Sequence, residues 1–401
     1  MILSLMLMQP CGFNMTVYFD YQSSKPVDPR VITAMKPYFY DKFGNPSSLH
    51  QVGDEATKAL DNARQTIANF ITAEKNEIIF TSGATESNNL ALIGFALRNK
   101  NKGNHIIISE IEHISIHNIA KFLTKNGFTV SKVPVDQFGK VSIEKIEERI
   151  NEKTILVSIG YANNEIGTIQ PIVEIGELCR GKNIAFHSDA VPAEGLLPLD
   201  VNKDNLDLLT LSSNDIYGPK GIGALYIRKG IKLNPLIIGG GQERGLRSGT
   251  ENIPGIVGMT KAVEIVERET NEEVKRFIRY RDMLIKNILE KIPKSHLNGH
   301  PIDRLPNNAH FRFDGIEGES LLLLLKDESI AVSTGSACSS KTLEPSHTLI
   351  ATGLLHEEAH GSLQISCGRF TTKRNIDSLL NILPTVVYRL RKLSPLYTEE
   401  K

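Results

Sequence analysis

Short β-rich runs alternate with longer helical patterns along this chain, and the alternation constrains the fold more than any other feature. Six runs rich in aliphatic residues are expected to be strands: 77–83, 105–109, 155–159, 184–190, 206–212 and 223–228. Helical spacing of apolar residues occurs at 54–71, 116–126, 143–151 and 171–181. Strands separated by helices form a mostly parallel sheet with crossover helices. This part of the chain is therefore predicted to be α/β, and such sheets bind ligands at the carboxyl ends of their strands.

The last third of the chain follows a different pattern. A long charged amphipathic stretch at 257–292 is expected to form one helix. After it come the segment NNAHFRFDG, a helix in ESLLLLLKD, a strand in IAVSTGS, the segment LQISCGR and a final helix. This order predicts a smaller α+β domain that a connecting helix joins to the first.

Composition argues against several classes of partner. Lysine plus arginine and aspartate plus glutamate number 46 each, so the net charge is zero and gives no electrostatic footprint for nucleic acid or an anionic membrane. The apolar run MILSLMLM is too short to span a bilayer and lacks a basic flank. Because MTVYFDY begins like an ordinary first strand, we expect residues 1–15 to be an extension and translation to start at Met15.

Cysteine usage favours the cytoplasm. Four cysteines lie far apart with no CxxC pair: Cys11, Cys179, Cys338 and Cys367. This spacing is typical of a reduced intracellular protein, and not of a disulfide framework or a zinc knuckle. Cys338 stands in the Gly/Ser-rich segment STGSACSS, where we expect the exposure and freedom to move that a nucleophilic thiol needs. Cys367 lies within a strand pattern and is expected to be buried and inert.

A polar loop follows one of the predicted strands. The apolar run from Leu206 to Leu211 ends in four polar residues, and a Gly-punctuated second strand comes next. These polar residues are Ser212, Ser213, Asn214 and Asp215. A buried strand that delivers polar side chains at its carboxyl end is how α/β enzymes present a site. The only lysine nearby is Lys220, between a proline and a glycine.

The segment TSGATESNN at 81–89 follows another predicted strand and precedes a helix. Gly83 permits a tight turn, and Ala84 and Thr85 would place backbone N–H groups and a hydroxyl at the start of the helix. Such a place can bind an anion. By themselves, these residues favour an ordinary helix N-cap over an anion site.

Three further features carry polar or titratable groups. Asp189 ends an apolar strand, where its carboxylate can hold a protonated heterocyclic nitrogen or act as a structural cap or ion pair. His113 follows a strand, and it is either a ring that stacks on a flat ligand or a polar loop residue. HEEAH at 356–360 matches the zincin pattern HExxH, but a strand pattern follows at once without a spaced third ligand, so we expect no metal there.

Together these segments resemble cysteine desulfurases of the NifS/IscS type. The motifs occur in the order of that family: DYQSSKPVDPRV, FGNPSSLH, FTSGATESNNLA, EH at 112–113, NNEIGTIQPI, FHSDA, IYGPKGIGALY, GGGQERGLRSGTEN, STGSACSS and LEPSH. The resemblance covers the chain from Met15 to about Leu390.

The resemblance implies a homodimer of the pyridoxal 5′-phosphate (PLP) dependent transferase fold type I, the aspartate-aminotransferase fold. It implies a large cofactor-binding domain with a mostly parallel sheet at 28–270, and a small α+β domain built from 16–27 and 271–401. In the family, PLP labilises the C–S bond of cysteine. A loop cysteine takes the sulfur as a persulfide and passes it to an iron–sulfur scaffold protein.

Carried over position by position, the resemblance assigns most of a cofactor pocket. Ala84, Thr85 and Ser212 match ligands of the PLP phosphate. Thr250 matches a phosphate contact that the partner subunit donates.

The resemblance also assigns the residues around the ring and the sulfur. His113 matches the residue that stacks on the pyridine, and Asp189 matches the partner of the ring nitrogen. Asn164 matches a residue beside the ring and the substrate, and Cys338 matches the sulfur acceptor.

Four positions depart from the family pattern at the reaction centre. Asp215 stands where the Schiff-base lysine belongs, and Asn214 replaces the histidine before it, so both are predicted to lie at the cofactor. Pro192 replaces a glutamine that contacts the phenolic oxygen of PLP, and Gln364 replaces the arginine that binds the substrate carboxylate. A carboxylate cannot bond to the PLP aldehyde, and glutamine cannot form a bidentate clamp. We therefore expect PLP to be held without a covalent bond and desulfuration to be impaired.

Two lysines are candidates to replace the missing one. Lys220 belongs to the family's own GPKG and is expected to be structural. Lys25 replaces a threonine in a segment that faces the substrate in the family. It either reaches the cofactor aldehyde, or it pairs with Asp215 or lies in solvent.

Two functions follow, and the sequence leaves open whether cysteine is desulfurated at all. The first is an iron–sulfur cluster assembly component that binds a scaffold protein and presents Cys338 as sulfur donor. The alternative is a non-catalytic protein that binds the scaffold and whose Cys338 thiolate ligates a nascent iron–sulfur cluster.

Overall fold

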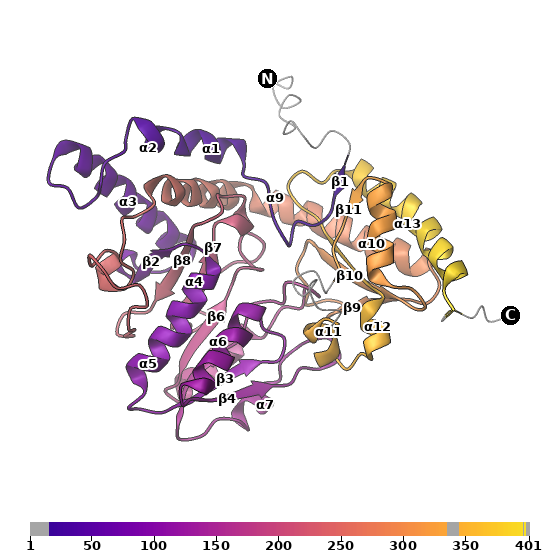
Figure 1. Ribbon diagram of the computed structural model, residues 1–401, viewed down its shortest axis with the longest axis horizontal. Helices are drawn as coiled ribbons and strands as arrows, with labels where there is room; N and C mark the ends of the chain where they lie inside the picture. The colour runs from indigo at the N-terminus through magenta and orange to yellow at the C-terminus, as the bar shows by residue number, and fades with distance from the viewer. Residues whose placement is uncertain (1–15, 335–344, 396, 398–401) are drawn as a thin grey trace.

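A computed structural model describes residues 16–334, 345–395 and 397, and its largest sheet confirms the predicted α/β fold (Figure 1). The sheet has seven strands in the order β2–β8–β7–β6–β5–β3–β4. They are β2 (Ile78–Thr81), β3 (His105–Ser109), β4 (Thr129–Val133), β5 (Thr154–Ser158), β6 (Ala185–Asp189), β7 (Leu208–Ser212) and β8 (Gly223–Ile227). Only β8 runs against its neighbours, so the sheet is mostly parallel.

Each of the six predicted strands is present, and β4 is the strand that the sequence did not predict. Its residues, TVSKV, are mostly half-buried or exposed, since β4 is the edge strand. An edge strand with polar side chains lacks the continuous apolar run that identifies β3 or β5.

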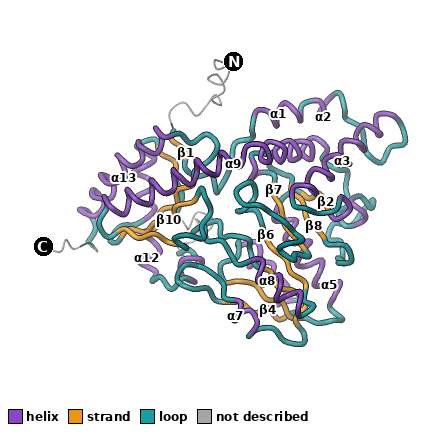
Figure 2. The backbone as a smooth tube through the Cα atoms, turned by 180° about the vertical axis from the view of Figure 1, so that it is seen from behind, coloured by secondary structure: helices purple, strands orange, loops and turns teal. Residues whose placement is uncertain are grey.

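Helices cover both faces of this sheet, as the alternating pattern predicted (Figure 2). The helices of this part are α1 (Pro29–Met35), α2 (Pro37–Tyr40), α3 (Gln51–Phe70), α4 (Ala84–Asn89), α5 (Phe95–Asn99), α6 (Ile114–Lys125), α7 (Ile143–Glu147) and α8 (Ile172–Gly181). Successive side chains of β3 point to opposite faces: Ile106 and Ile108 pack with α5 and α6, and Ile107 packs with α3 and α8.

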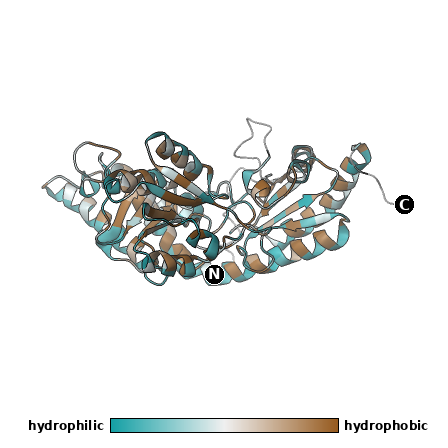
Figure 3. Cartoon of the chain, turned by 90° about the horizontal axis from the view of Figure 1, so that it is seen from below, coloured by the Kyte–Doolittle hydropathy of each residue, from teal (hydrophilic) through white to brown (hydrophobic). Residues whose placement is uncertain are grey.

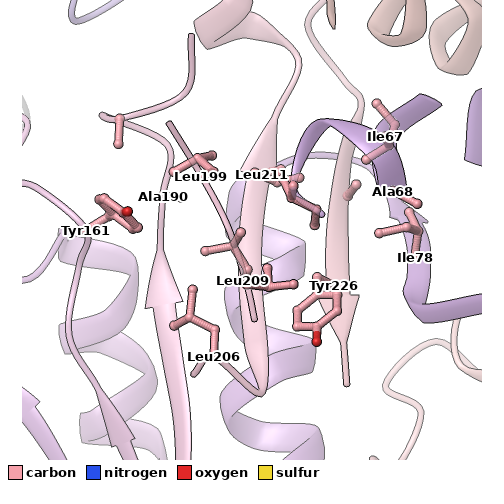
Figure 4. Packing of buried hydrophobic residues seen from close by; sticks show 14 of the residues in the cluster. Ile67, Ala68, Ile78, Tyr161, Ala190, Leu199, Leu206, Leu209, Leu211 and Tyr226 are labelled. Carbon is pink, nitrogen blue, oxygen red and sulfur yellow. The ribbon is translucent and has the colours of Figure 1, made fainter. Parts of the chain in front are cut away.

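The apolar core on the α3 side is the larger of the two. Leu209 and Leu211 of β7 belong to this core, with Tyr226 on the neighbouring strand β8 and Ile67 on α3 (Figure 4). The strands form the apolar interior, and the outer faces of the helices are hydrophilic (Figure 3). Because the strands are buried on both faces, their polar residues can emerge only at the strand ends.

A single helix, α9 (Ile253–Lys291), joins this sheet to a second core and confirms the predicted connecting helix. Val263 and Val266 pack in the first core, and Leu284 and Ile288 pack in the second. The second core contains an antiparallel sheet of order β12–β10–β9. Its elements are β9 (Ser295–Asn298), β10 (Asn308–Phe313), α10 (Gly318–Asp327), β11 (Ile330–Ala331), β12 (Ser362–Ser366) and α13 (Lys373–Leu393).

The start of the described chain belongs to this second core. Strand β1 (Val17–Tyr18) pairs in parallel with β11, and the Ser366 N–H donates to the Phe19 carbonyl at 2.8 Å. The chain then crosses to α1 and the large sheet. The domain boundaries at 27/28 and 270/271 remain a prediction.

Two short helices, α11 (His347–Ala351) and α12 (His356–His360), lie beside the second core. HEEAH forms α12, and both its histidines are exposed. In the described ranges no three His, Cys, Asp or Glu side chains are grouped as a metal site. None of the described helices is long and apolar enough to cross a membrane.

Truncation of Leu209 is expected to destabilise the large core. Leu209→Ala removes a fully buried side chain from β7, which commonly lowers the free energy of unfolding by about 2–5 kcal/mol. Leu323→Ala, on a side chain of α10 that is 61% exposed, is the matched control and should change it little. Denaturant unfolding of the two variants measures the difference, and equal losses would contradict this account of the core.

Candidate functional site

A cavity of about 220 Å³ opens at the carboxyl ends of four adjacent strands. Residues after β3, β5, β6 and β7 line it, together with residues from the start of α4 and from the segment after β1. The chain order reverses here, because β4 lies on one side of β3 while β5, β6 and β7 follow on the other. Ligands of open α/β sheets bind at such a reversal.

The loop after β7 brings Ser212, Asn214 and Asp215 to this cavity. After the buried strand, the chain makes a tight turn at Asn214–Ile216, and Tyr217 adopts a left-handed conformation with φ 63°. This conformation is unfavourable for tyrosine, but Arg369 holds it: the Arg369 N–H donates to the Tyr217 hydroxyl at 2.7 Å, and its guanidinium lies over the ring.

Asp189 and His113 line the same cavity from neighbouring strands. The Asp189 carboxylate is buried and accepts hydrogen bonds from the Asn88 amide at 2.7 Å and the Val191 N–H at 3.1 Å. Burial raises the pKa of Asp189, and His113 lowers it. The His113 ring is exposed, and its Nδ1 bonds the Ser115 hydroxyl at 2.8 Å. The fixed carboxylate of Asp189 and the exposed ring of His113 suit a flat, cationic heterocycle.

Three more predicted residues line the cavity, and one described residue does not. Ala84 and Thr85 at the start of α4 and Asn164 after β5 are among the lining residues. Thr250 is exposed and lies outside the lining of its own chain. Cys338 falls outside the described residues, so its predicted role stays a prediction.

Comparison with known proteins shows which family this chain belongs to. The Aminotransferase class-V model matches residues 17–379. Cysteine desulfurase IscS 1 of Archaeoglobus fulgidus is 57% identical over 380 residues, which cover 95% of this chain and 99% of that protein. The chain belongs to the cysteine desulfurase family of class-V aminotransferases.

Other relatives agree along nearly the whole length. Cysteine desulfurase IscS of Methanosarcina thermophila is 51% identical over 387 residues, covering 96% of each chain. A solved structure of a NifS-like protein superposes with a TM-score of 0.88 at 38% identity, covering 94% of this chain and all of the other. The family carries the PLP-dependent transferase fold type I, so the predicted fold class is confirmed.

Asp215, predicted to stand at the lysine position of the desulfurase family, is a buried residue of the cavity wall. Burial raises its pKa, and Lys25 and hydrogen bonds with Ser212 and Asn214 lower it. The Lys25 Nζ donates to the backbone carbonyl of Asp215. The Asp215 side chain is therefore fixed by hydrogen bonds within its own loop, and the Asp215 backbone carbonyl accepts from one buried amine.

Neither candidate lysine lines the cavity. Lys25 is buried in a second, smaller cavity beside Glu194, Tyr217 and Glu273, on the other side of Asp215. Burial lowers the pKa of Lys25, and the carboxylates of Asp215 and Glu194 raise it. Lys220 is exposed, and its Nζ lies 3.4 Å from the Lys25 carbonyl. Of the two expectations for Lys25, the structure supports pairing with the Asp215 residue.

Pro192 and Gln364 are predicted to replace a glutamine and an arginine of the family, and their surroundings differ. Pro192 lines the cavity and has no side-chain donor for a phenolic oxygen. Gln364 of β12 is buried, and its amide donates to the backbone carbonyls of Asn164 at 2.7 Å and Glu165 at 3.0 Å. Gln364 is not among the lining residues of the cavity. Its two hydrogen bonds join the loop after β5 to the second core.

Two buried acids at this site were not predicted from the sequence. Glu112 accepts from the Ser109 hydroxyl at 2.7 Å and the Gly160 N–H at 3.0 Å, and burial raises its pKa to about 7. Glu194 accepts from the Ser212 N–H at 2.6 Å, and burial together with Asp215 raises its pKa well above the ordinary value. Glu112 stands next to the predicted site residue His113, which is a weak sequence signal for a role in the site. Glu194 has no such signal beyond its place after β6.

The residues present suit the non-covalent contacts of PLP and not the covalent one. Asp189 is a buried, fixed carboxylate for a ring N–H, and the hydroxyls of Thr85 and Ser212 suit a phosphate. No lysine or arginine is among the described residues of the wall. Among these residues, nothing can bond to an aldehyde carbon as an amine does.

Reductive labelling should separate the roles of residues 25 and 215. After incubation with PLP and borohydride, wild-type peptides containing Lys25 are expected to carry no adduct, because this amine lies outside the cavity. Asp215→Lys should give an adduct at residue 215, and Asp215→Asn should give none there. Peptide mapping by mass spectrometry reads the result. An adduct on Lys25 in the wild type would contradict the geometry.

Glu112 should make stability depend on pH. Its pKa is raised from 4.5 to about 7, so the folded protein binds this proton more tightly than the unfolded chain does. The free energy of unfolding is therefore expected to fall as the pH rises from about 4.5 to about 7 and then to level off. Glu112→Gln should remove this part of the fall, on the order of 3 kcal/mol.

Denaturant unfolding at several pH values measures the effect. Glu152→Gln, which changes an exposed side chain before β5, is the control and should leave the wild-type slope in place. The same slope in Glu112→Gln as in the wild type would show that Glu112 is not the group responsible.

Proposed function

We propose that this protein is an iron–sulfur cluster assembly component of the cysteine desulfurase family. It binds PLP without a covalent bond, forms a homodimer in the cytoplasm and presents Cys338 to an iron–sulfur scaffold protein. Its desulfuration of cysteine is impaired because Asp215 takes the place of the lysine. The observation that carries the proposal is the Asp215 carboxyl group in the wall of a cavity that Asp189, His113, Thr85 and Ser212 also line.

The roles of the chain's own residues follow from their contacts. PLP, when bound, supplies an electron-withdrawing ring that weakens bonds next to the amino acid Cα. Asp189 would hold the proton of the ring nitrogen, since Asn88 and Val191 fix its carboxylate. Asp215 can hold or release a proton but cannot act as an amine nucleophile. Gln364 offers no charge to a substrate carboxylate because a carboxamide is neutral, and its N–H groups already donate to two backbone carbonyls.

The homodimer has its own support. Thr250 is exposed and does not line the cavity of its own chain. This is the position expected of a residue that contacts the phosphate in a partner subunit. The exposed Ile238, in the same loop, is 85% accessible in the single chain and would be covered by such a partner.

A second candidate function is a non-catalytic scaffold-binding protein whose Cys338 ligates the nascent cluster. What favours it is that two of the four replaced residues have an internal partner. Asp215 interacts with Lys25, and Gln364 bonds two backbone carbonyls. A pocket stabilised by such internal contacts can keep its structure when the family's reaction no longer takes place in it.

The first test compares rates of sulfide release from cysteine in the presence of PLP. The triple variant Asp215→Lys, Pro192→Gln, Gln364→Arg is expected to exceed the wild type by about 100-fold or more, because it regains the amine and the carboxylate clamp. Adding Cys338→Ser to this variant should abolish transfer of sulfur to the scaffold protein. A wild type as fast as the triple variant would refute the impaired chemistry.

The second test supplies sulfide and iron to the scaffold protein in complex with this chain. If Cys338→Ser shortens the lifetime of the assembled cluster, the thiolate is a ligand and the second candidate holds. If this substitution matters only when cysteine is the sulfur source, the thiol is a sulfur acceptor. Cys179→Ala, a buried cysteine of the large core, is the control. Failure to bind the scaffold protein would exclude both functions.

A further inference from the structure

The wall of the main cavity has an unusual balance of charge. Its described residues include three acids, Glu112, Asp189 and Asp215, and no lysine or arginine. Glu194 lies directly behind, where its Oε1 accepts from the Ser212 N–H and its Oε2 is buried without a hydrogen-bond partner. A ligand that brings positive charge to this cavity is therefore favoured over one that brings none.

The one buried amine nearby does not remove this imbalance. Lys25 interacts electrostatically with the carboxylates of both Asp215 and Glu194, so one ammonium offsets the charge of two acids. Its Nζ is directed to the backbone carbonyl of Asp215. Arg369, the next cation, is already paired with Asp28 at 2.8 Å and Glu273 at 2.8 Å. Asp215 thus belongs to a cavity wall whose described lining residues include no lysine or arginine.

The carboxylate at position 215 also determines where the cationic group of a ligand is expected to lie. In the family, the residue at this position faces the carbon of PLP that bears the aldehyde, so this step rests on the proposed PLP site. A lysine amine there complements an aldehyde, whereas a carboxylate complements an amine. Pyridoxamine 5′-phosphate carries a protonated amine on that carbon and is otherwise the same molecule as PLP. Its ring nitrogen can still meet Asp189.

We propose that this cavity selects pyridoxamine 5′-phosphate over PLP, with the Asp215 carboxylate as the residue that recognises the ligand's amine. Asp189 and Asp215 then bind the two cationic positions of one ring from the ends of adjacent strands, β6 and β7. The amine form of the cofactor is the resident ligand, and the selectivity belongs to the charge at position 215. A neutral side chain of the same shape is expected to lose it.

The test measures equilibrium binding to the purified full chain. Titration calorimetry compares pyridoxamine 5′-phosphate with pyridoxine 5′-phosphate, which has a neutral hydroxyl in place of the amine and cannot react with lysines. The chain has no tryptophan, so the ligand's own fluorescence can also follow its displacement by PLP. The wild type is expected to bind the amine at least about tenfold more tightly than either other form, the size of one charge-assisted hydrogen bond.

Two substitutions assign the preference to its residue. Asp215→Asn keeps the shape and removes the charge, and the ratio of dissociation constants should fall close to one. Asp327→Asn removes the same charge from an exposed position at the end of α10 and should leave the ratio unchanged. Equal binding of the three ligands by the wild type overturns the proposal, as does a preference that survives in Asp215→Asn.

The outcome also separates this inference from the function on which it rests. If PLP or pyridoxine 5′-phosphate binds at least as tightly as the amine, the cofactor site stands and only the selectivity is wrong. If none of the three binds, both the selectivity and the proposed PLP site are wrong.

Discussion

The shared direction of β3, β5, β6 and β7 is the constraint on which the rest of this site depends. Strands buried on both faces cannot carry polar side chains in their middle without partners, so polar groups gather where the strands end. Parallel strands end at the same edge, and Glu112, Asn164, Asp189 and Asp215 meet there although they are spread over more than a hundred positions of the sequence. The family's chemistry can be altered at this edge while the sheet beneath stays the same.

Burial sets the electrostatics of this edge. Isolated buried carboxylates are costly, and their pKa values rise until a positive partner or hydrogen bonds offset the loss of water. Asp189 has two hydrogen-bond donors and Asp215 has Lys25 close by, whereas one oxygen of Glu194 has no partner. Lys25 and Asp215 therefore belong together. An aspartate at position 215 without an amine behind it would be a buried acid with little reason to ionise.

Much of this fold follows from periodicity, because apolar runs and helical spacing reflect burial directly. The six predicted strands and the long α9 helix are local patterns, and the structure contains them. The edge strand β4 was missed because its side chains are half in water. At the site, the positions of Ala84, His113 and Asp189 could be predicted, since each follows a strand or opens a helix, whereas Asn164 was predicted only from the family resemblance. Glu194 could not, because its burial depends on contacts with Ser212 and Lys25 that are distant in the sequence.

The replaced residues bear on whether the site is degraded or specialised. A position that has merely lost its function leaves polar groups without partners. The buried Oδ1 of Asn214 has no hydrogen-bond partner. By contrast, Gln364 joins β12 to the loop after β5 through two hydrogen bonds, and Asp215 is bonded within its own turn and, through its backbone carbonyl, to a buried lysine. Lys25 and Asp215 are both predicted to depart from the family pattern, and they lie close to each other. Lys25 offsets part of the negative charge of Asp215, and the acidic charge left in the cavity wall favours a ligand that carries a cation.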